Sequence, residues 1–164
     1  MIIKYFDLKK NLDTKINFYL LYGLNIGLVE ETINNIFKPN FSANIHLYDE
    51  VEILNNSDEF KEKIYNKSFF ENDKLVIVNR TTDKILTLLE DIIDKNIPDL
   101  KVILKSGVLE KKSKLRNFFE KNLNTIIVPF YEDNNQTLSS IAQNFFKDKK
   151  IPISFQNINI IVER

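Results

Sequence analysis

The chain has 164 residues, of which 43% are hydrophobic and 28% charged, so it is long enough for one full hydrophobic core and part of a second unit. Lysine and arginine number 23, as do aspartate and glutamate, so the formal net charge is zero and no global field draws the chain onto nucleic acid. Cysteine is absent and His46 is the single histidine, which excludes disulfide scaffolds, thiol catalysis and cysteine zinc sites and disfavours a histidine-based metal site.

Five short apolar runs, separated by segments of helical length, predict the strands of one sheet. Every connection is long enough for a helix, and no Asn-Gly or Asp-Gly hairpin turn occurs. The predicted fold class is therefore α/β, with a five-stranded parallel sheet, right-handed crossovers and helices on both faces. The runs cover residues 18–22, 44–48, 75–78, 101–104 and 125–128.

The segments between these runs carry apolar residues at helical spacing. The first helix follows Gly27 and ends at Pro39, because proline interrupts a helix. Ser57 is the expected N-cap of the second helix, and the third begins at Asp83. The fourth, a basic helix, is predicted over Lys111–Asn122.

The pattern changes after Pro129. A helical stripe begins at Leu138, is broken at residues 151–154, and is followed by an apolar run that stops near the C-terminus. We expect residues 1–135 to form the α/β domain and residues 136–164 to be the truncated beginning of a helical domain, in a fragment of a longer protein. With no signal-peptide pattern and no run of about 20 apolar residues, we expect a cytoplasmic protein without membrane contact.

The glycine-containing turn after the first run invites a comparison with phosphate-binding loops. A loop of the form G-x-x-x-x-G-K-[ST] cradles phosphates with backbone N–H groups, a lysine and a hydroxyl. Here Gly23 and Gly27 are one residue too close, Leu28 stands in the place of the lysine and Val29 in the place of the hydroxyl. The third run ends in Asn79 without the acidic residue that orders magnesium. We therefore interpret this segment as a degenerate phosphate loop whose glycines serve the turn.

Other catalytic patterns are missing from the sequence. His46 has no cysteine nearby, and no G-x-S-x-G sequence marks a serine nucleophile. A surface or core-edge histidine is the simpler interpretation. We expect no catalytic residue, no metal and no cofactor.

Adjacent aromatic residues, Phe69 and Phe70, follow the second predicted helix and Ser68. Consecutive helical positions point about 100° apart, so both rings cannot join one inward face. At least one ring is therefore expected to face outward, where it can enter a pocket of a partner. The alternative is that one ring closes the core and the other covers a loop.

A cluster of cations lies between residues 105 and 116. Its side chains can contact phosphates or a partner, although a solvated helix face is the simpler interpretation because no aromatic residues are interleaved with the cations. Beyond Lys105, the cluster contains Lys111, Lys112, Lys114 and Arg116.

The order of these segments resembles the N-terminal region of the bacterial DNA polymerase III delta subunit family, a component of the clamp loader. The resemblance rests on FYLLYGLNIGLVEE from residue 18, SFFENDKLVIV from residue 68, KVILKSGVLEKKSKLRNFFEK from residue 101 and the following VPFYED. It covers most of the chain.

The resemblance implies an AAA+ ATPase fold with a degenerate nucleotide site, followed by the start of a small helical lid. Members of the family insert a Leu-Phe pair into a pocket of the sliding clamp and favour an opened ring. In this chain the pair becomes Phe69 and Phe70, preceded by Ser68, with Phe69 in the usual place of leucine. The implied partners are the sliding clamp (beta subunit), other clamp-loader subunits through domains outside this chain, and DNA indirectly through the complex.

Two alternatives remain open from the sequence. An AAA+-type ATPase with an atypical phosphate loop would bind and hydrolyse ATP. A nucleic-acid-binding module would use the basic cluster at residues 105–116.

Overall fold

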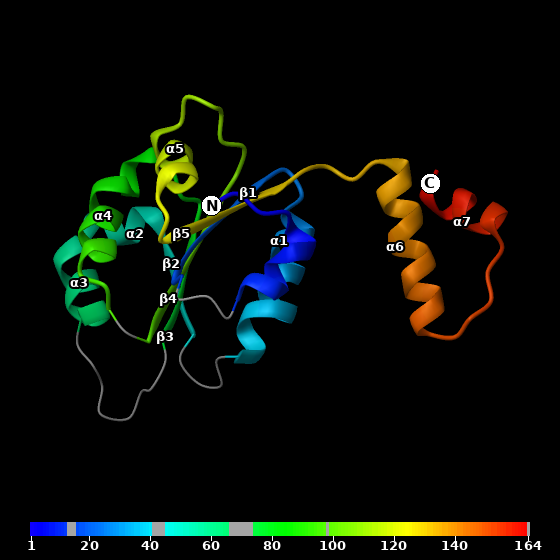
Figure 1. Ribbon diagram of the computed structural model, residues 1–164, viewed down its shortest axis with the longest axis horizontal. Coiled ribbons are helices and arrows are strands. Elements are labelled where there is room, and N and C mark those ends of the chain that lie inside the picture. The colour runs from blue at the N-terminus through cyan, green and yellow to red at the C-terminus, as the bar shows by residue number, and fades with distance from the viewer. Residues whose placement is uncertain (13–15, 41–44, 66–73, 98, 164) are drawn as a thin grey trace. The chain divides into compact units, whose positions relative to one another are not determined.

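The computed structural model describes residues 1–12, 16–40, 45–65, 74–97 and 99–163. The described chain divides into two compact units, Met1–Phe130 and Tyr131–Arg164. The first unit is a five-stranded sheet between two layers of helices (Figure 1). The strands are β1 (Phe18–Gly23), β2 (Ile45–Asp49), β3 (Lys74–Asn79), β4 (Leu100–Ser106) and β5 (Thr125–Phe130).

The strand order is β2-β3-β4-β1-β5, and all paired strands run parallel. β1 lies between β4 and β5, with Leu20 opposite Leu104 and Ile127. All five strands were predicted from the apolar runs. Four of those runs lie within an observed strand, and the run predicted over residues 44–48 overlaps β2 from Ile45 onward. The α/β class and the parallel pairing are confirmed.

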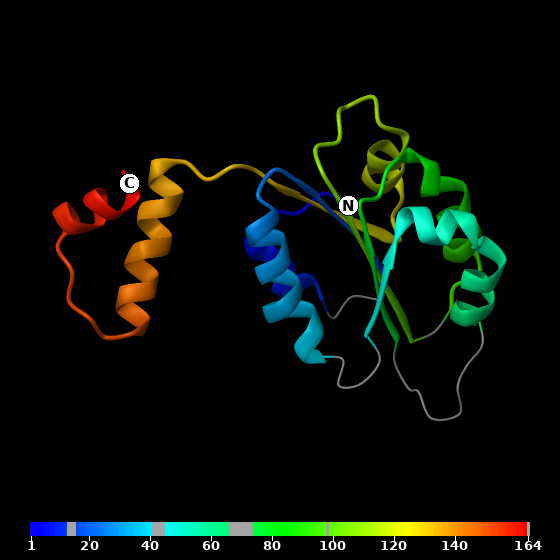
Figure 2. The same cartoon turned by 180° about the vertical axis from the view of Figure 1, so that it is seen from behind.

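Strands β1, β3, β4 and β5 are buried on both faces, with alternate residues pointing to opposite sides, whereas the edge strand β2 is only partly covered. In β1, Leu20 belongs to the core cluster under one helical layer and Leu21 to the cluster under the other. Figures 1 and 2 show α1 on one side of the sheet and the other helices of this unit on the opposite side. These are α2 (Glu50–Asn55), α3 (Ser57–Tyr65), α4 (Leu86–Asp94) and α5 (Lys114–Lys121).

The first helix begins earlier and ends less regularly than predicted. α1 covers Ile26–Thr32 and continues as a π-helical turn, Ile33–Phe37, and a 3-10 turn, Lys38–Asn40. The Asn25 side chain accepts a hydrogen bond from the Leu28 N–H and so caps the helix. Gly27 therefore lies inside the first turn of the helix rather than before it.

Two further helix boundaries correct the sequence predictions. The carboxylate of Asp49 accepts a hydrogen bond from the Val51 N–H and caps α2, a helix that the sequence pattern did not indicate. Ser57 is consequently the first residue of α3 and not its N-cap. α5 begins at Lys114 with Ser113 as N-cap, so Lys111 and Lys112 precede the helix that was predicted to contain them.

The second unit contains α6 (Asn135–Asp148) and α7 (Phe155–Val162). A capping box formed by Asn134 and Thr137 fixes the start of α6. Among the described residues of this unit, one apolar side chain is buried, that of Ile158. No helix in the described part of the chain is long and apolar enough to cross a membrane.

Candidate functional site

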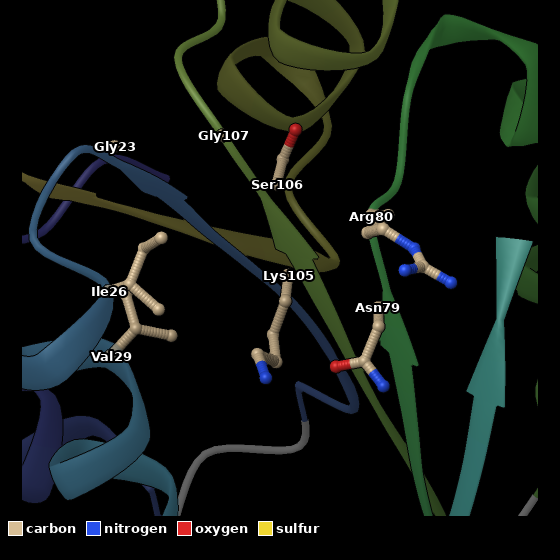
Figure 3. Close-up of a pocket in the computed structure, with 8 residues that line it drawn as sticks. All are labelled: Gly23, Ile26, Val29, Asn79, Arg80, Lys105, Ser106 and Gly107. Carbon is tan, nitrogen blue, oxygen red and sulfur yellow. The ribbon is translucent and has the colours of Figure 1, made fainter.

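A pocket of about 180 Å³ lies where β1, β3 and β4 end, next to α1. Carboxyl ends of parallel strands are where open α/β sheets bind ligands. Figure 3 shows Ile26 and Val29 of α1 on one side of the pocket, Lys105 on β4, and Asn79 at the end of β3. The remaining lining residues are Gly23, Arg80, Ser106 and Gly107.

The turn at Gly23 directs its backbone donors into the protein. Gly23 has a φ of 140°, and its N–H donates to the Gly107 carbonyl at 3.1 Å. The Phe130 carbonyl accepts from the next two N–H groups, those of Leu24 at 3.1 Å and Asn25 at 3.4 Å. These donors, which a phosphate-binding loop would aim at its ligand, already have partners within the chain.

Leu28 and Val29 both lie in α1. In the sequence they occupy the places of the lysine and the hydroxyl residue of a phosphate-binding loop. Val29 is buried and faces the pocket, while Leu28 packs against the core cluster under α1. The pocket wall formed by α1 is therefore apolar.

The two cationic residues that line the pocket are both ion-paired. The Lys105 ammonium pairs with the Glu30 carboxylate. The Arg80 guanidinium pairs with Asp49 at 2.5 Å, and Figure 3 shows the Arg80 side chain turned away from Ile26 and Val29. Neither pair is readable from spacing, because each joins segments that only the fold brings together.

A tightly held loop presents Arg80 at this edge of the sheet. Arg80 has a φ of 55°, an uncommon conformation for a residue with a side chain. Thr81 follows it, buried, and donates both its N–H and its hydroxyl to the Lys105 carbonyl at 2.9 and 3.0 Å. The Thr82 N–H donates to the buried carboxylate of Glu50 at 2.6 Å. The loop is thereby fixed to strand β4 through Lys105 and to helix α2 through Glu50.

The predicted clamp-binding residues Ser68, Phe69 and Phe70 lie outside the described residues. The segments on either side of them are described and contact each other. The Lys74 ammonium, at the start of β3, donates to the Lys63 carbonyl in α3 at 3.1 Å.

Only some of the predicted basic cluster is available for an anionic partner. Lys112 pairs with Glu110 at 2.8 Å. Arg116 pairs with Glu120 at 2.7 Å and lies 5.3 Å from the centre of the Tyr22 ring. Within the described ranges no ion pair is formed by Lys111 or Lys114, and both are exposed.

Asp83, which the sequence indicated only as a helix start, also fixes the beginning of the basic helix α5. Its carboxylate accepts hydrogen bonds from the Ser113 hydroxyl at 2.6 Å and from the N–H groups of Lys114 and Leu115 at 3.0 and 2.9 Å. The Ser113 hydroxyl bond above all, and then the Leu115 N–H, hold the pKa of Asp83 below its ordinary value.

His46 lies on β2, half-buried, with its ring stacked on that of Tyr48 at a centroid distance of 6.5 Å. Its Nε2 has no hydrogen-bond partner among the residues described. In that same part of the chain, no group of three or more acidic or histidine side chains has a geometry suited to a metal ion.

The parallel sheet, the glycine turn at the end of the inner strand β1 and the pocket beside it define an open α/β protein with a pocket at the carboxyl ends of its strands. The profile of the family described as "DNA polymerase III, delta subunit" matches residues 19–128, well over half of the sequence. The chain belongs to this family, as the resemblance predicted.

One solved structure supports the fold. The DNA clamp loader delta protein (YqeN) of Bacillus subtilis aligns with a TM-score of 0.67 and 22% sequence identity, over 96% of this chain and 51% of that one. This chain thus spans about half the length of that relative. Domain III of the replication initiation protein DnaA from Thermotoga maritima aligns with a TM-score of 0.48 and 11% identity, over 97% of this chain and 72% of that one. No curated protein matches the sequence.

Proposed function

We propose that this chain acts in a clamp loader by binding the sliding clamp through Phe69 and Phe70, with Ser68 before them, and by favouring an opened clamp. The observation that carries this proposal is the family match over residues 19–128, which includes the aromatic pair. The likeness to a structure named as a DNA clamp loader delta protein supports it.

Burial of the two rings supplies the binding energy. A phenylalanine side chain removed from water contributes roughly 2 to 3 kcal/mol, and a few such side chains dominate most interfaces. A subunit that binds the opened clamp more tightly than the closed one shifts the clamp toward the open form by that difference in affinity. No chemical step by this chain is needed.

We propose that the chain does not hydrolyse ATP, because its phosphate loop at Gly23 is degenerate. Three observations support this part of the proposal: the loop N–H groups are bound to carbonyls, α1 presents apolar side chains, and Lys105 is paired with Glu30. ATP would then act on sibling subunits.

The wider assembly is also a proposal, since the chain spans about half of its structural relative. Helices α6 and α7 would begin the helical lid, within residues 136–164. Contacts to the other loader subunits would come from domains outside this chain, DNA would be reached through the complex, and the site of action would be the cytoplasm.

The decisive experiment is calorimetric titration of this chain with the sliding clamp of the same organism. We expect Phe69→Ala/Phe70→Ala to weaken binding by about 3 kcal/mol or more, because two anchoring rings are removed. Phe69→Leu is expected to bind, since leucine fills a similar apolar pocket. Phe6→Ala/Phe155→Ala removes two rings that are 60% and 66% exposed elsewhere, and serves as the matched control.

Adding Mg-ATP to the same titration is expected to leave the clamp affinity unchanged. Equal binding by the Phe69→Ala/Phe70→Ala protein, or an absence of binding by the folded native chain, would refute the proposed clamp contact. Hydrolysis of ATP by the chain, abolished by a substitution in the Gly23 turn, would refute the proposed loss of ATPase activity.

A further inference from the structure

A shallow groove runs along the outer surface between α4 and α5, on the helical layer that contains α2 and α3. Its hollow has a volume of about 680 Å³. The α5 residues that line it recur at three- and four-residue spacing and therefore share one face of the helix. The principal lining residues are Leu86 and Glu90 from α4 and Lys114, Asn117, Phe118 and Lys121 from α5.

The floor of the groove is apolar and held in place by the protein core. Leu86 and Phe118 are half-buried and both pack against the core cluster beneath α4 and α5. The Phe118 ring meets Phe119 edge-on, with ring centres 5.9 Å apart, and Phe119 is fully buried. An apolar side chain entering the groove would therefore meet a surface that is already ordered, which lowers the entropic cost of binding.

Cations occupy the rim of the groove. Lys114 and Lys121 line it and are exposed. Lys111, also exposed, precedes α5, and its carbonyl accepts a hydrogen bond from the Asn117 amide at 2.8 Å. None of these three lysines forms an ion pair with any residue that the structure describes. Glu90 is the carboxylate that lines the groove, so its charge is positive overall.

We propose that this groove binds an acidic segment of a partner protein, one that carries a large apolar side chain between carboxylates. The apolar side chain would lie on Leu86 and Phe118, and the carboxylates would pair with Lys114 and Lys121. These two lysines are seven residues apart, which is about 10 Å along the helix. That spacing suits carboxylates on either side of one apolar anchor.

A nucleic-acid backbone fits the groove less well. Phosphates need closely spaced cations along their path, and affinity for them rises with the number of cations engaged. Here the cations stand at the rim of an apolar floor, and the whole chain has a net charge of zero. An acidic peptide with an apolar anchor matches both features.

The proposal is tested by recording amide NMR spectra of the full chain during titration with a 13-residue peptide that has three glutamates on each side of a central phenylalanine. Saturable shifts are expected for amides of residues 86–90 and 114–122. Lys114→Glu/Lys121→Glu is expected to weaken binding at least tenfold. The control Lys147→Glu/Lys149→Glu makes the same change of charge on exposed positions of the second unit and should bind as the native chain does.

Two further ligands distinguish an acidic peptide with an apolar anchor from other molecules that could bind the groove. A peptide with serine in place of phenylalanine should bind at least tenfold more weakly. Equal binding would overturn the proposal, because it would mean that only the lysines, and not the apolar floor, contribute to the affinity. A DNA duplex that shifts the same amides at lower concentration would overturn it in favour of a nucleic-acid site. An absence of shifts with the acidic peptide would overturn it outright.

Discussion

Gly23 has a backbone conformation that other residues avoid. Its φ is 140°, and a Cβ built on it would lie 2.0 Å from the Phe130 carbonyl oxygen. We predict that Gly23→Ala lowers the free energy of unfolding by about 3 kcal/mol, because it adds backbone strain and a clash with main-chain atoms that cannot move independently. Urea denaturation followed by circular dichroism measures this loss.

Gly107 provides the matched control for that substitution. A Cβ at Gly107 would meet no atom within 4 Å, although its carbonyl accepts the Gly23 N–H. Gly107→Ala is therefore expected to change stability by less than about 0.5 kcal/mol. Similar losses for the two variants would contradict the assignment of Gly23 as the constrained turn.

At the scale of elements, strands were predictable and some helix ends were not. A buried parallel strand has a continuous apolar run, such as residues 125–128 of β5, and that signal is local. The start of α5 depends on Asp83, about 30 residues earlier, and no local pattern shows that contact. α2 escaped prediction because six residues are too few to display helical periodicity.

Asp83 should make the stability of α5 dependent on pH. Its pKa is held below the ordinary value of about 3.9, chiefly by the Ser113 hydroxyl, so its stabilising effect is complete above that value. As the pH falls through the lowered pKa, the carboxylate is protonated and the effect is lost. We predict that Asp83→Asn destabilises the protein by about 1 kcal/mol at pH 7, and that this difference shrinks below pH 4.

Urea denaturation of both proteins at pH 7 and at pH 3 measures the change. The Ser113→Ala substitution supplies a second check, because its cost should be smaller in the Asp83→Asn background than in the native protein if the two side chains act together. A difference between native protein and Asp83→Asn that stays constant with pH would contradict the assigned role.

At the scale of the whole molecule, some features of the candidate site could be predicted from the sequence and others depend on the fold. The missing lysine and hydroxyl at Leu28 and Val29 were readable from the sequence. The ion pair that Lys105, a residue lining the pocket, forms with Glu30 was not readable, because these residues are 75 positions apart and meet only when α1 packs beside β4. Phe69 and Phe70, predicted from the sequence, lie outside the described residues.

The two units of the chain should also differ in local stability. The unit Met1–Phe130 has core clusters on both faces of its sheet. Among the described residues of Tyr131–Arg164, Ile158 is the one buried apolar side chain, and α6 buries none of its residues. An amphipathic helix owes most of its stability to packing of its apolar face. We therefore predict that amides of α6 exchange with solvent at least about a hundredfold faster than those of α4.

Hydrogen exchange followed by mass spectrometry makes this comparison within one sample. α4 is the matched helix, because it buries Leu88, Leu89, Ile92 and Ile93 against the sheet. Its amides should open only with the core of the first unit, while those of α6 need only the separation of two short helices. Equal protection of α6 and α4 would mean that the apolar side chains of α6, among them Ile141 and Phe145 at 49% and 55% exposure, are covered in solution.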